Sequence, residues 1–573
     1  MRLFHPAIVL RVALLLVCLL QGLIAFEYDQ AARAASPREE QAGFPLDDAW
    51  IHQVYARSLA ERLALEFNPG EPEAGQSSLL WVALLAPVQK VAGLLSIPVP
   101  RLTRLLGLLI WIALALLTAL VVTGLPIPGA RFGAFAAALL IALDPALAFA
   151  SASGMEPLLL SLCLMLALLG LVRRKELLCG AGCALLVLAR PEGVLPAALI
   201  AGTMLWTSGP GRAARFARVG LPPLLSAGLW ISICLSISGR PFPNTYYVKA
   251  SAIPIPEALS GSLASLAGLF DNSPFYRNYV GYLFLFIGLV ALLARAGRRL
   301  NLVLLLAAPC YLFGVAATRG LPEPTAFFWE RYLIPAIPSL SLLAAVGWAG
   351  AGAVLADLIR RPASSATPEA IEPEAIEPDP IETEAPAESD PDPRAEPLAL
   401  PQPASPSLPV PDLVLMIVLA ILILFPFGAV PEAFMRSIQE FGENVSDVDR
   451  MNVEAALWLR DEPLIRPEMV LATQDAGALR YFTSNERVVD LLGLNDHRLV
   501  ETGLADQSIE PYLDRLAPRI MVLLDPDPGA LQFWLYAARR GLREVARFGT
   551  DDYSLFGRPS PRALVVLADL PPG

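Results

Sequence analysis

The feature that most constrains this chain is a series of apolar runs that recurs from the N-terminus to residue 430. Each is about 18–20 residues long, which is enough for one helix to cross membrane hydrocarbon. Of 573 residues, 55% are hydrophobic and 17% are charged, which excludes a soluble globular protein. We therefore expect an α-helical polytopic membrane protein. After the first segment, candidate spans lie near 104–124, 132–150, 157–172, 177–189, 194–207, 221–238, 279–295, 301–317, 333–357 and 412–430.

Basic residues predict how these spans are oriented, because loops rich in Arg and Lys remain in the cytoplasm. Such residues flank spans at 173–175, 212–218, 295–299 and 360–361. They all fall on one side if 177–189 and 194–207 are two short crossings, and if 78–97 is an interfacial or re-entrant helix. The result is about eleven transmembrane helices, with the N-terminus inside and the C-terminus outside.

The first apolar segment has two interpretations. Residues 1–26 resemble a membrane anchor, but "ARAAS" at 32–36 loosely resembles a signal-peptide cleavage site. We favour the anchor, and both interpretations place residue 27 onward outside the cytoplasm. Either interpretation predicts an external loop over 27–103 and a helical module that extends to residue 361.

The formal net charge of −11 does not identify a partner. Residues 362–411 contain 11 acidic residues and one Arg among many prolines, so this segment alone contributes −10. Such a composition cannot bury a core, and it predicts a disordered cytoplasmic linker between residue 361 and the last span, 412–430. Nothing in the composition predicts a nucleic-acid partner.

The C-terminal residues 431–573 have the pattern of a small external α/β domain. The segments 469–473, 519–525 and 563–570 are apolar and rich in β-branched residues, which predicts strands. Residues 449–460 and 532–547 have helical periodicity. We expect this domain to cover an external site or to bind acceptor glycan.

In the predicted topology, five polar clusters gather at the external face. They are "LDDAWIH" (46–52), "SGMEP" (153–157), "ARPEG" (189–193), "GRPFPNTYYVK" (239–249) and "FFWERYLIP" (327–335). Any one of them could be an interfacial anchor. Ionisable groups beside hydrocarbon are costly, however, and they usually face a cavity or a partner. Five clusters on one side predict a site at the outer membrane surface.

The charged side chains in and beside these clusters suit transfer of a group from a lipid phosphate. Carboxylates can deprotonate a hydroxyl or hold a metal, and Arg and Lys bind phosphate. The leaving phosphate is already a stable anion, so cations need only stabilise its developing charge. The acids are Asp47, Asp48, Glu156 and Glu192, and the bases are Arg57, Arg190, Lys249 and Arg331.

These residues resemble a known superfamily. "DDAWIHQVYARSLAERLALEFNPGEPEAGQSSLLW" (47–81) is similar to the first external loop of GT-C membrane glycosyltransferases that use polyprenyl-phosphate sugars. It is most similar to the terminal arabinofuranosyltransferase-like group, although Ser58 replaces the usual Asn and "AGQSS" is a loose match. The clusters "SGMEP", "ARPEG", "PNTYYVK" and "RYLIPAIP" follow in the order of that family, and "ATQDAGALRYFTSNERVVDLLGLND" (472–496) resembles its external tail domain.

The resemblance implies a GT-C-like fold and an inverting glycosyltransferase of cell-wall biogenesis in the bacterial inner membrane. The donor would be a polyprenyl-phosphate sugar, carrying a hexose or a pentose. The acceptor would be a hydroxyl of a cell-envelope glycan, lipid or protein on the periplasmic side. The alternative is a transporter or flippase of lipid-linked saccharides, for which inverted repeats and charges near the bilayer midplane are expected instead.

The resemblance also implies roles for individual residues. Asp47 or Asp48 would be the catalytic base, and Asp47 is favoured by its place in the family. Two adjacent helical residues point about 100° apart, so only one of the two should face the cavity. The expected substrate-binding residues are Glu156, Arg57, Arg190, Glu192, Tyr246, Lys249 and Arg331.

A metal requirement stays open at this stage. If a divalent cation is present, Asp47 and Glu156 would hold it, and an acidic cluster without His or Cys would suit Mg²⁺, Mn²⁺ or Ca²⁺ rather than zinc. Metal-free catalysis is equally compatible with these residues.

Several other residues have two interpretations. Trp50, Tyr246, Tyr247 and Trp329 are aromatic residues either of the membrane interface or of a sugar-stacking site. His52 lies one helical turn after Asp48 and could either only pair with it or take a catalytic role. "RPEG" could be a turn closed by an Arg190–Glu192 pair.

Overall fold

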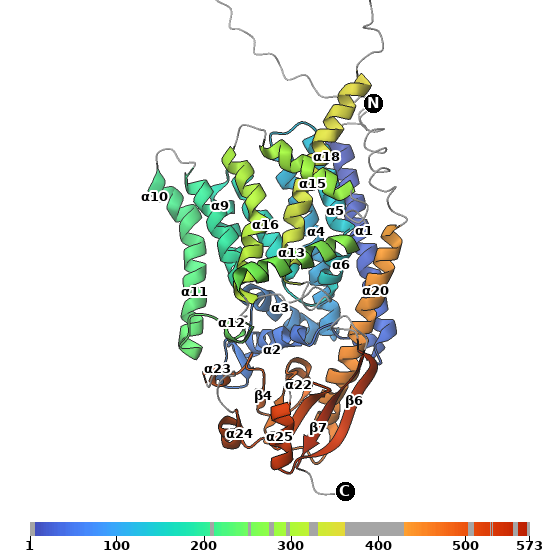
Figure 1. Cartoon of the computed structure of the whole chain (residues 1–573), viewed down its shortest axis with the longest axis vertical. Coiled ribbons are helices and arrows are strands. Elements are labelled where there is room, and N and C mark those ends of the chain that lie inside the picture. Colours follow the sequence, from blue (N-terminus) through green and yellow to red (C-terminus); the bar gives the residue numbers. More distant parts are fainter. Residues whose placement is uncertain are drawn as a thin grey trace, which may run out of the picture.

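The structure is a computed structural model, in which three layers follow one another along the long axis (Figure 1). A helical bundle forms one end, α2 and α3 form a middle layer, and a mixed sheet forms the other end. The predicted linker 362–411 lies outside the described residues, and so does nearly all of the predicted span 412–430. The structure describes residues 6–206, 211–249, 254–273, 280–293, 298–319, 331–360, 429–501, 509–527, 529, 531–553 and 560–569.

The bundle consists of long and short apolar helices. The long ones are α1 (Pro6–Ala35), α4 (Val99–Thr123), α11 (Leu221–Ser238), α16 (Arg298–Arg319) and α18 (Ile337–Arg360). The others are α5 (Ala130–Ala142), α6 (Pro145–Ala152), α7 (Pro157–Val172), α8 (Glu176–Ala189), α9 (Val194–Trp206), α10 (Arg212–Arg215), α12 (Asn244–Lys249), α13 (Ile255–Asn272) and α15 (Val280–Leu293).

The predicted total of about eleven crossings is not confirmed. Within the described ranges, five helices are long and apolar enough to span a membrane, or six if one bent pair counts as a span. Helices α7, α8 and α15 are apolar but have only 14 to 16 residues, fewer than the roughly 20 that cross hydrocarbon without tilt or thinning. The turn predicted between 189 and 194 is present, as the 3-10 turn Pro191–Gly193 between α8 and α9.

One predicted span is broken. The segment 132–150 forms α5 and α6, which are bent by 58° relative to each other. The break falls at Asp144, whose side chain accepts a hydrogen bond from the backbone N–H of Leu147 at 3.0 Å and so caps α6. Because α6 has its own N-cap and Pro145 at its first position, it starts as a separate helix and does not continue the direction of α5.

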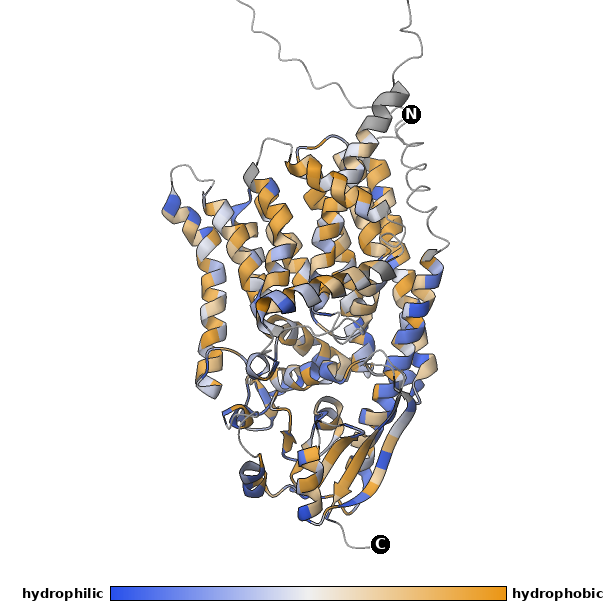
Figure 2. Ribbon diagram, viewed as in Figure 1, coloured by the Kyte–Doolittle hydropathy of each residue, from blue (hydrophilic) through white to orange (hydrophobic). Residues whose placement is uncertain are grey.

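The helices of the bundle consist mostly of hydrophobic residues (Figure 2), and many of these are exposed. On α1, Leu15, Leu16 and Leu23 are 59%, 60% and 66% exposed, and on α11 Leu224 and Leu225 are 58% and 62% exposed. Such a surface has no favourable contact with water, but it matches hydrocarbon. The chain is therefore a multi-pass membrane protein.

The middle layer is built from the loop between α1 and α4. Helix α2 (Asp47–Arg62) buries ten of its residues, because the bundle covers one side of it and the C-terminal domain the other. A two-stranded hairpin, β1 (Glu66–Asn68) and β2 (Glu71–Pro72), follows it. Helix α3 (Leu79–Leu95) lies across the end of the bundle beside α2 (Figure 1), which agrees with the prediction that 78–97 does not continue the bundle.

The C-terminal domain is a mixed five-stranded sheet with the order β4-β3-β5-β7-β6. Strands β4, β3 and β5 are parallel, whereas β7 pairs antiparallel with both β5 and β6. The strands are β3 (Leu471–Thr473), β4 (Val488–Asp490), β5 (Ile520–Asp525), β6 (Arg543–Tyr553) and β7 (Ser560–Ala568), and the helices are α20 (Ala429–Val448), α21 (Glu454–Asp461), α22 (Gly477–Phe482), α23 (His497–Glu501), α24 (Glu510–Leu516) and α25 (Leu531–Arg539).

The three predicted strands and the helix near 449–460 are present in this domain. The predicted helix 532–547 is wrong in its last part, because α25 ends at Arg539 and Arg543 begins strand β6. Gly541 lies at φ +74° between the two elements and ends the helix. Strand β4, which pairs with β3, was not among the three predicted strands.

Buried polar contacts hold this domain against the middle layer. The Asn68 side chain donates to the carbonyl of Val488 at 3.0 Å and accepts from the N–H of Val488 at 2.9 Å, as a neighbouring strand would. Arg480 Nε donates to the carbonyl of Phe67 at 2.9 Å, and Tyr55 Oη donates to Asn495 Oδ1 at 3.0 Å. These hydrogen-bonding groups are buried and cannot bond to water instead, so they fix the domain to the first loop.

We predict that the sheet end of the molecule is external. Helix α10, with Arg212 and Arg215, lies at the end of the bundle opposite the sheet (Figure 1). By the positive-inside rule that end faces the cytoplasm. In intact cells, an impermeant maleimide should label Gln532→Cys in the sheet domain. It should label Ala213→Cys on α10 only after permeabilisation. The labelling of each variant is compared with that of the unaltered chain. The reverse pattern would overturn the orientation.

A second prediction concerns the contact between the hairpin and β4. Asn68→Ala removes both hydrogen bonds to Val488, and loss of buried bonds of this kind costs about 1–3 kcal/mol. Amide exchange at Val488 should then accelerate by roughly ten- to a hundredfold. Glu71→Gln in the same hairpin is the control, because Glu71 only makes a partly exposed 3.7 Å ion pair with Arg487. Equal exchange in the two variants would contradict this role of Asn68.

Candidate active site

A small polar cavity lies between α2, the bundle and the C-terminal domain. Its volume is about 30 Å³, close to the space that one water molecule occupies. Three cations and two carboxylates line it, and one of the cations, Arg190, also pairs with Glu192, so the charges of the site balance. The lining residues are Asp48, Ile51, His52, Gly75, Gln76, Ser77, Met155, Glu156, Arg190, Thr245, Lys249, Arg331, Tyr332 and Leu494.

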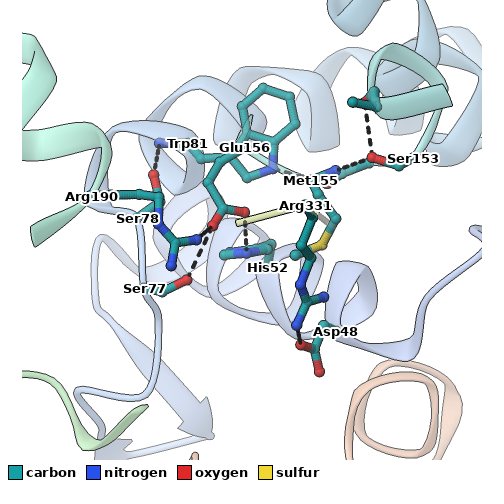
Figure 3. Close-up of polar contacts among 12 residues, drawn as sticks. Asp48, His52, Ser77, Ser78, Trp81, Ser153, Met155, Glu156, Arg190 and Arg331 are labelled. Carbon is teal, nitrogen blue, oxygen red and sulfur yellow. Dashed lines mark hydrogen bonds and ion pairs between the residues drawn. The ribbon is translucent and has the colours of Figure 1, made fainter. Parts of the chain in front are cut away.

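Asp48 is held between two cations from distant segments. Its Oδ2 lies 2.6 Å from Nη2 of Arg331, which precedes α18 (Figure 3). The same oxygen lies 3.2 Å from Nζ of Lys249, at the end of α12. Burial alone would raise the pKa of Asp48, but the charges of Lys249 and Arg331 outweigh it and hold that pKa well below its usual range. The carboxylate is therefore ionised, and both cations are available to an anion that displaces it.

Asp47 points away from this cavity, toward the C-terminal domain. Its two carboxylate oxygens accept hydrogen bonds from the backbone N–H groups of Gly477 and Ala478 at 2.7 and 2.8 Å. Burial and the nearby charge of Asp475 raise the pKa of Asp47 to about 8, against the effect of these two amides. As expected from the helix geometry, only one residue of the pair faces the cavity, but it is Asp48 rather than the favoured Asp47.

A second cluster of charge surrounds Glu156 on the far side of the cavity. Arg190 donates to Glu156 Oε1, His52 Nε2 lies 3.2 Å from Glu156 Oε2, and Ser77 Oγ donates to Oε1 at 3.4 Å (Figure 3). His52 thus pairs with Glu156 and not with Asp48. Glu156 is fully buried, so its charge is compatible with the fold only because these partners surround it.

The loop that carries Glu156 is fixed by close packing. Trp81 Nε1 donates to the carbonyl of Gly154 at 2.9 Å. Gly154 has φ +78°, and a Cβ there would lie 2.6 Å from a ring carbon of Phe44. Only glycine allows the backbone to come this close to the Phe44 ring, and this course of the loop places the Glu156 carboxylate at the cavity.

Besides Asp47, three of the predicted site residues do not line the cavity. Arg57 packs over the ring of Tyr481 at 4.3 Å and donates to the Tyr481 carbonyl at 3.0 Å, so it contacts the C-terminal domain. Glu192 forms the internal pair with Arg190 at 3.2 and 3.3 Å that the "RPEG" turn suggested. Tyr246 packs against Phe242 and Tyr247. Trp329 lies outside the described residues.

The sequence did not single out several residues that line the cavity. Gln76 and Ser77 belong to the loosely matching "AGQSS" stretch, and Thr245 and Tyr332 lie directly beside predicted residues. These residues could have been identified from the sequence by their positions within the quoted motifs. Leu494 comes from the C-terminal domain, and no local pattern indicates that it reaches this cavity.

The arrangement does not fit a divalent cation. Asp47 and Glu156, the expected ligands, have their oxygens turned to backbone amides and to Arg190 and His52 respectively. Asp48 is likewise bound by two cations. The part of the chain that the structure describes contains no group of three or more His, Cys, Asp and Glu side chains that could hold a metal.

Comparisons of the sequence give limited matches. Residues 442–558 match a family described as a domain of unknown function, DUF8728, which covers much of the C-terminal domain. A search of curated proteins finds no match.

Solved structures match over almost the whole chain. ArnT from Cupriavidus metallidurans bound to undecaprenyl phosphate is 12% identical and covers 96% of this chain and 97% of its own, with a TM-score of 0.55. The apo oligosaccharyltransferase from Archaeoglobus fulgidus is 11% identical, covers 91% and 70%, and has a TM-score of 0.51. The mycobacterial arabinofuranosyltransferase AftD is 16% identical, covers 98% and 40%, and reaches 0.49. The first two matches establish that this chain has the fold of the GT-C glycosyltransferases.

Proposed function

We propose that the chain transfers a sugar from a polyprenyl-phosphate donor to a hydroxyl of a cell-envelope glycan, lipid or protein, with inversion, at the external face of the inner membrane. The observation that carries the proposal is the Asp48 carboxylate held between Lys249 and Arg331 in a cation-rich cavity. That cavity lies where the bundle meets the external layers, so a lipid-linked phosphate could reach it from the membrane.

The donor class follows from charge and from the fold. ArnT, whose fold this chain shares, has been crystallised with undecaprenyl phosphate. A phosphate needs several cationic donors at one place, and Arg331, Lys249 and Arg190 provide them.

The ion pairs of the free cavity suggest how the reaction is set up. A donor phosphate competes with Asp48 for Lys249 and Arg331, and when those cations move to the phosphate the Asp48 carboxylate is released. Loss of two positive neighbours raises the pKa of Asp48 toward that of an effective base. The base therefore forms only when the donor is bound.

In the chemical step, Asp48 takes the proton of the acceptor hydroxyl. The hydroxyl oxygen attacks the anomeric carbon from the face opposite the phosphate, and the bond from that carbon to the phosphate oxygen breaks with its electron pair on the leaving group. Lys249 and Arg331 stabilise the second negative charge that develops on the polyprenyl phosphate. Glu156, held by Arg190 and His52, faces the same cavity and would orient the acceptor.

The first test separates Asp48 from Asp47. Asp48→Asn removes proton acceptance with little change in volume, and general-base catalysis is typically worth about 10²–10⁴-fold. Membranes with this variant should lose at least about 10²-fold of sugar transfer from a polyprenyl-phosphate donor while expressing normally. Asp47→Asn is the matched control, and it should mainly weaken the contact with α22. Severe loss with Asp47→Asn and near-normal turnover with Asp48→Asn would reverse the assignment.

The second test concerns the cations. Lys249→Ala and Arg331→Ala each remove one charge-assisted contact, which is worth about 1.5–3 kcal/mol and corresponds to roughly a 10- to 150-fold loss in kcat/KM for the donor. Arg101→Ala on the exposed start of α4 is the control for loss of positive charge. Thermal unfolding should establish that each variant is folded. Unchanged donor kinetics in both cavity variants would refute phosphate binding at this site.

A further inference from the structure

A buried hydrogen-bonded cluster lies beside the cavity around Asp48. Its centre is Glu73, which directly follows the hairpin β1–β2 and is 6% exposed. The Glu73 carboxylate contacts Asn244, the first residue of α12, and His497, the first residue of α23 in the C-terminal domain. We call these three residues the Glu73 cluster. Each of them has a neighbour within three residues of the chain that lines the cavity, namely Gly75, Thr245 and Leu494.

Glu73 joins the C-terminal domain to the first loop. Nδ1 of His497 lies 2.6 Å from Oε1 of Glu73, and the backbone N–H of His497 donates to Oε2 at 3.3 Å. The backbone N–H of Glu73 donates to the carbonyl of Leu65 at 2.9 Å, which ties the residue to the start of the hairpin. A buried carboxylate is compatible with the fold only when such partners surround it, so each of these contacts is costly to lose.

The same carboxylate fixes the start of α12. Oε2 of Glu73 accepts a hydrogen bond from Nδ2 of Asn244 at 3.1 Å, and the backbone N–H of Asn244 donates to the carbonyl of Ala74 at 2.9 Å. Asn244 is fully buried. Helix α12 has only six residues, too few for a helix that is stable by itself, so its position depends on contacts of this kind.

A second contact joins α12 to the C-terminal domain. Helix α12 lies beside α23 (Figure 1), and Arg240, four residues before α12, contacts both. The guanidinium carbon of Arg240 lies 5.0 Å from the ring centroid of Tyr247, and Nη2 of Arg240 donates to the carbonyl of Val500 at 3.4 Å. The position of α12 is therefore set by the first loop and the C-terminal domain together.

The last residue of α12 is Lys249, which pairs with Asp48 in the cavity. Asn244 and Lys249 are separated by about 7.5 Å along the helix axis, so a shift at the start of α12 also moves the lysine. We infer that Glu73 is a positioning residue, which through Asn244 and α12 holds Lys249 where the donor phosphate binds. His497 makes this position depend on the C-terminal domain. The inference rests on the proposed function for the role of Lys249.

The Glu73 cluster holds Lys249 at a stage where Asp48 no longer does. In the proposed reaction a donor phosphate displaces the Asp48 carboxylate, so the ion pair between Asp48 and Lys249 is lost. The hydrogen bonds between Glu73 and Asn244 lie at the other end of α12 and are not part of that exchange. A lysine on an anchored helix loses less conformational freedom when the donor binds, which strengthens its contact with the phosphate.

The experiment is a double-mutant cycle between Glu73 and Lys249, measured as kcat/KM for the polyprenyl-phosphate donor. Glu73→Leu should lower this value about 10-fold, because a buried charged hydrogen bond is lost, and should leave KM for the acceptor unchanged. In the Lys249→Ala background the same change should cost less than about twofold, because the residue through which it acts is absent. Glu73→Gln keeps an acceptor for Asn244 and should retain most of the activity. Additive losses in the cycle would overturn the inference.

A second measurement does not depend on transfer. Amide exchange of α12, followed by mass spectrometry on the full chain in lipid nanodiscs, should accelerate about 10-fold in Glu73→Leu and about 5-fold in the milder variant His497→Ala. Glu71→Leu is the matched control and should leave this exchange unchanged, because Glu71 makes only a partly exposed 3.7 Å ion pair with Arg487. Unchanged exchange in both cluster variants would overturn the inference. Faster exchange together with normal donor use by Lys249→Ala would support the anchor and refute the proposed function.

Discussion

The two carboxylates at the start of α2 point about 100° apart, and the middle layer and the C-terminal domain are arranged around them. The Asp47 carboxylate accepts hydrogen bonds from the first two backbone N–H groups of α22 and so fixes the C-terminal domain. Asp48 binds Lys249 and Arg331 and so draws α12 and the segment before α18 to the same helix. The start of one helix thereby contacts three segments that lie 201, 283 and 430 residues further along the chain.

This arrangement requires that the charges compensate one another. An isolated carboxylate in such a buried place would be strongly unfavourable, and the same is true of Arg190 or Arg331 alone. Glu156 and Arg190 are each less than a tenth exposed, and each is compatible with the fold because the other is present. Mutually neutralised groups are compatible with burial, and the function that we propose uses them by exchanging an internal carboxylate for a substrate phosphate.

The C-terminal domain is more than an appendage in this arrangement. Leu494 lines the cavity around Asp48, and Tyr481 and Phe482 line a larger cavity on the other side of α2. The hydrogen bonds of Asn68, Tyr55 and Arg480 hold the domain in place. Because α2 is covered on both sides, each cover completes a different cavity.

The sequence by itself determined the membrane class, most helices of the bundle and the residues that carry charge at its external end, because hydrophobic length and charge are local properties. It also determined that Asp47 and Asp48 diverge, since that follows from helix geometry. Only the tertiary structure decided which of them faces the cavity, that His52 meets Glu156, and that Arg57 and Tyr246 lie elsewhere. These outcomes depend on contacts between segments hundreds of residues apart, such as Arg331 with Asp48 and Gly477 with Asp47, and no local pattern encodes which distant segment covers which face of a helix.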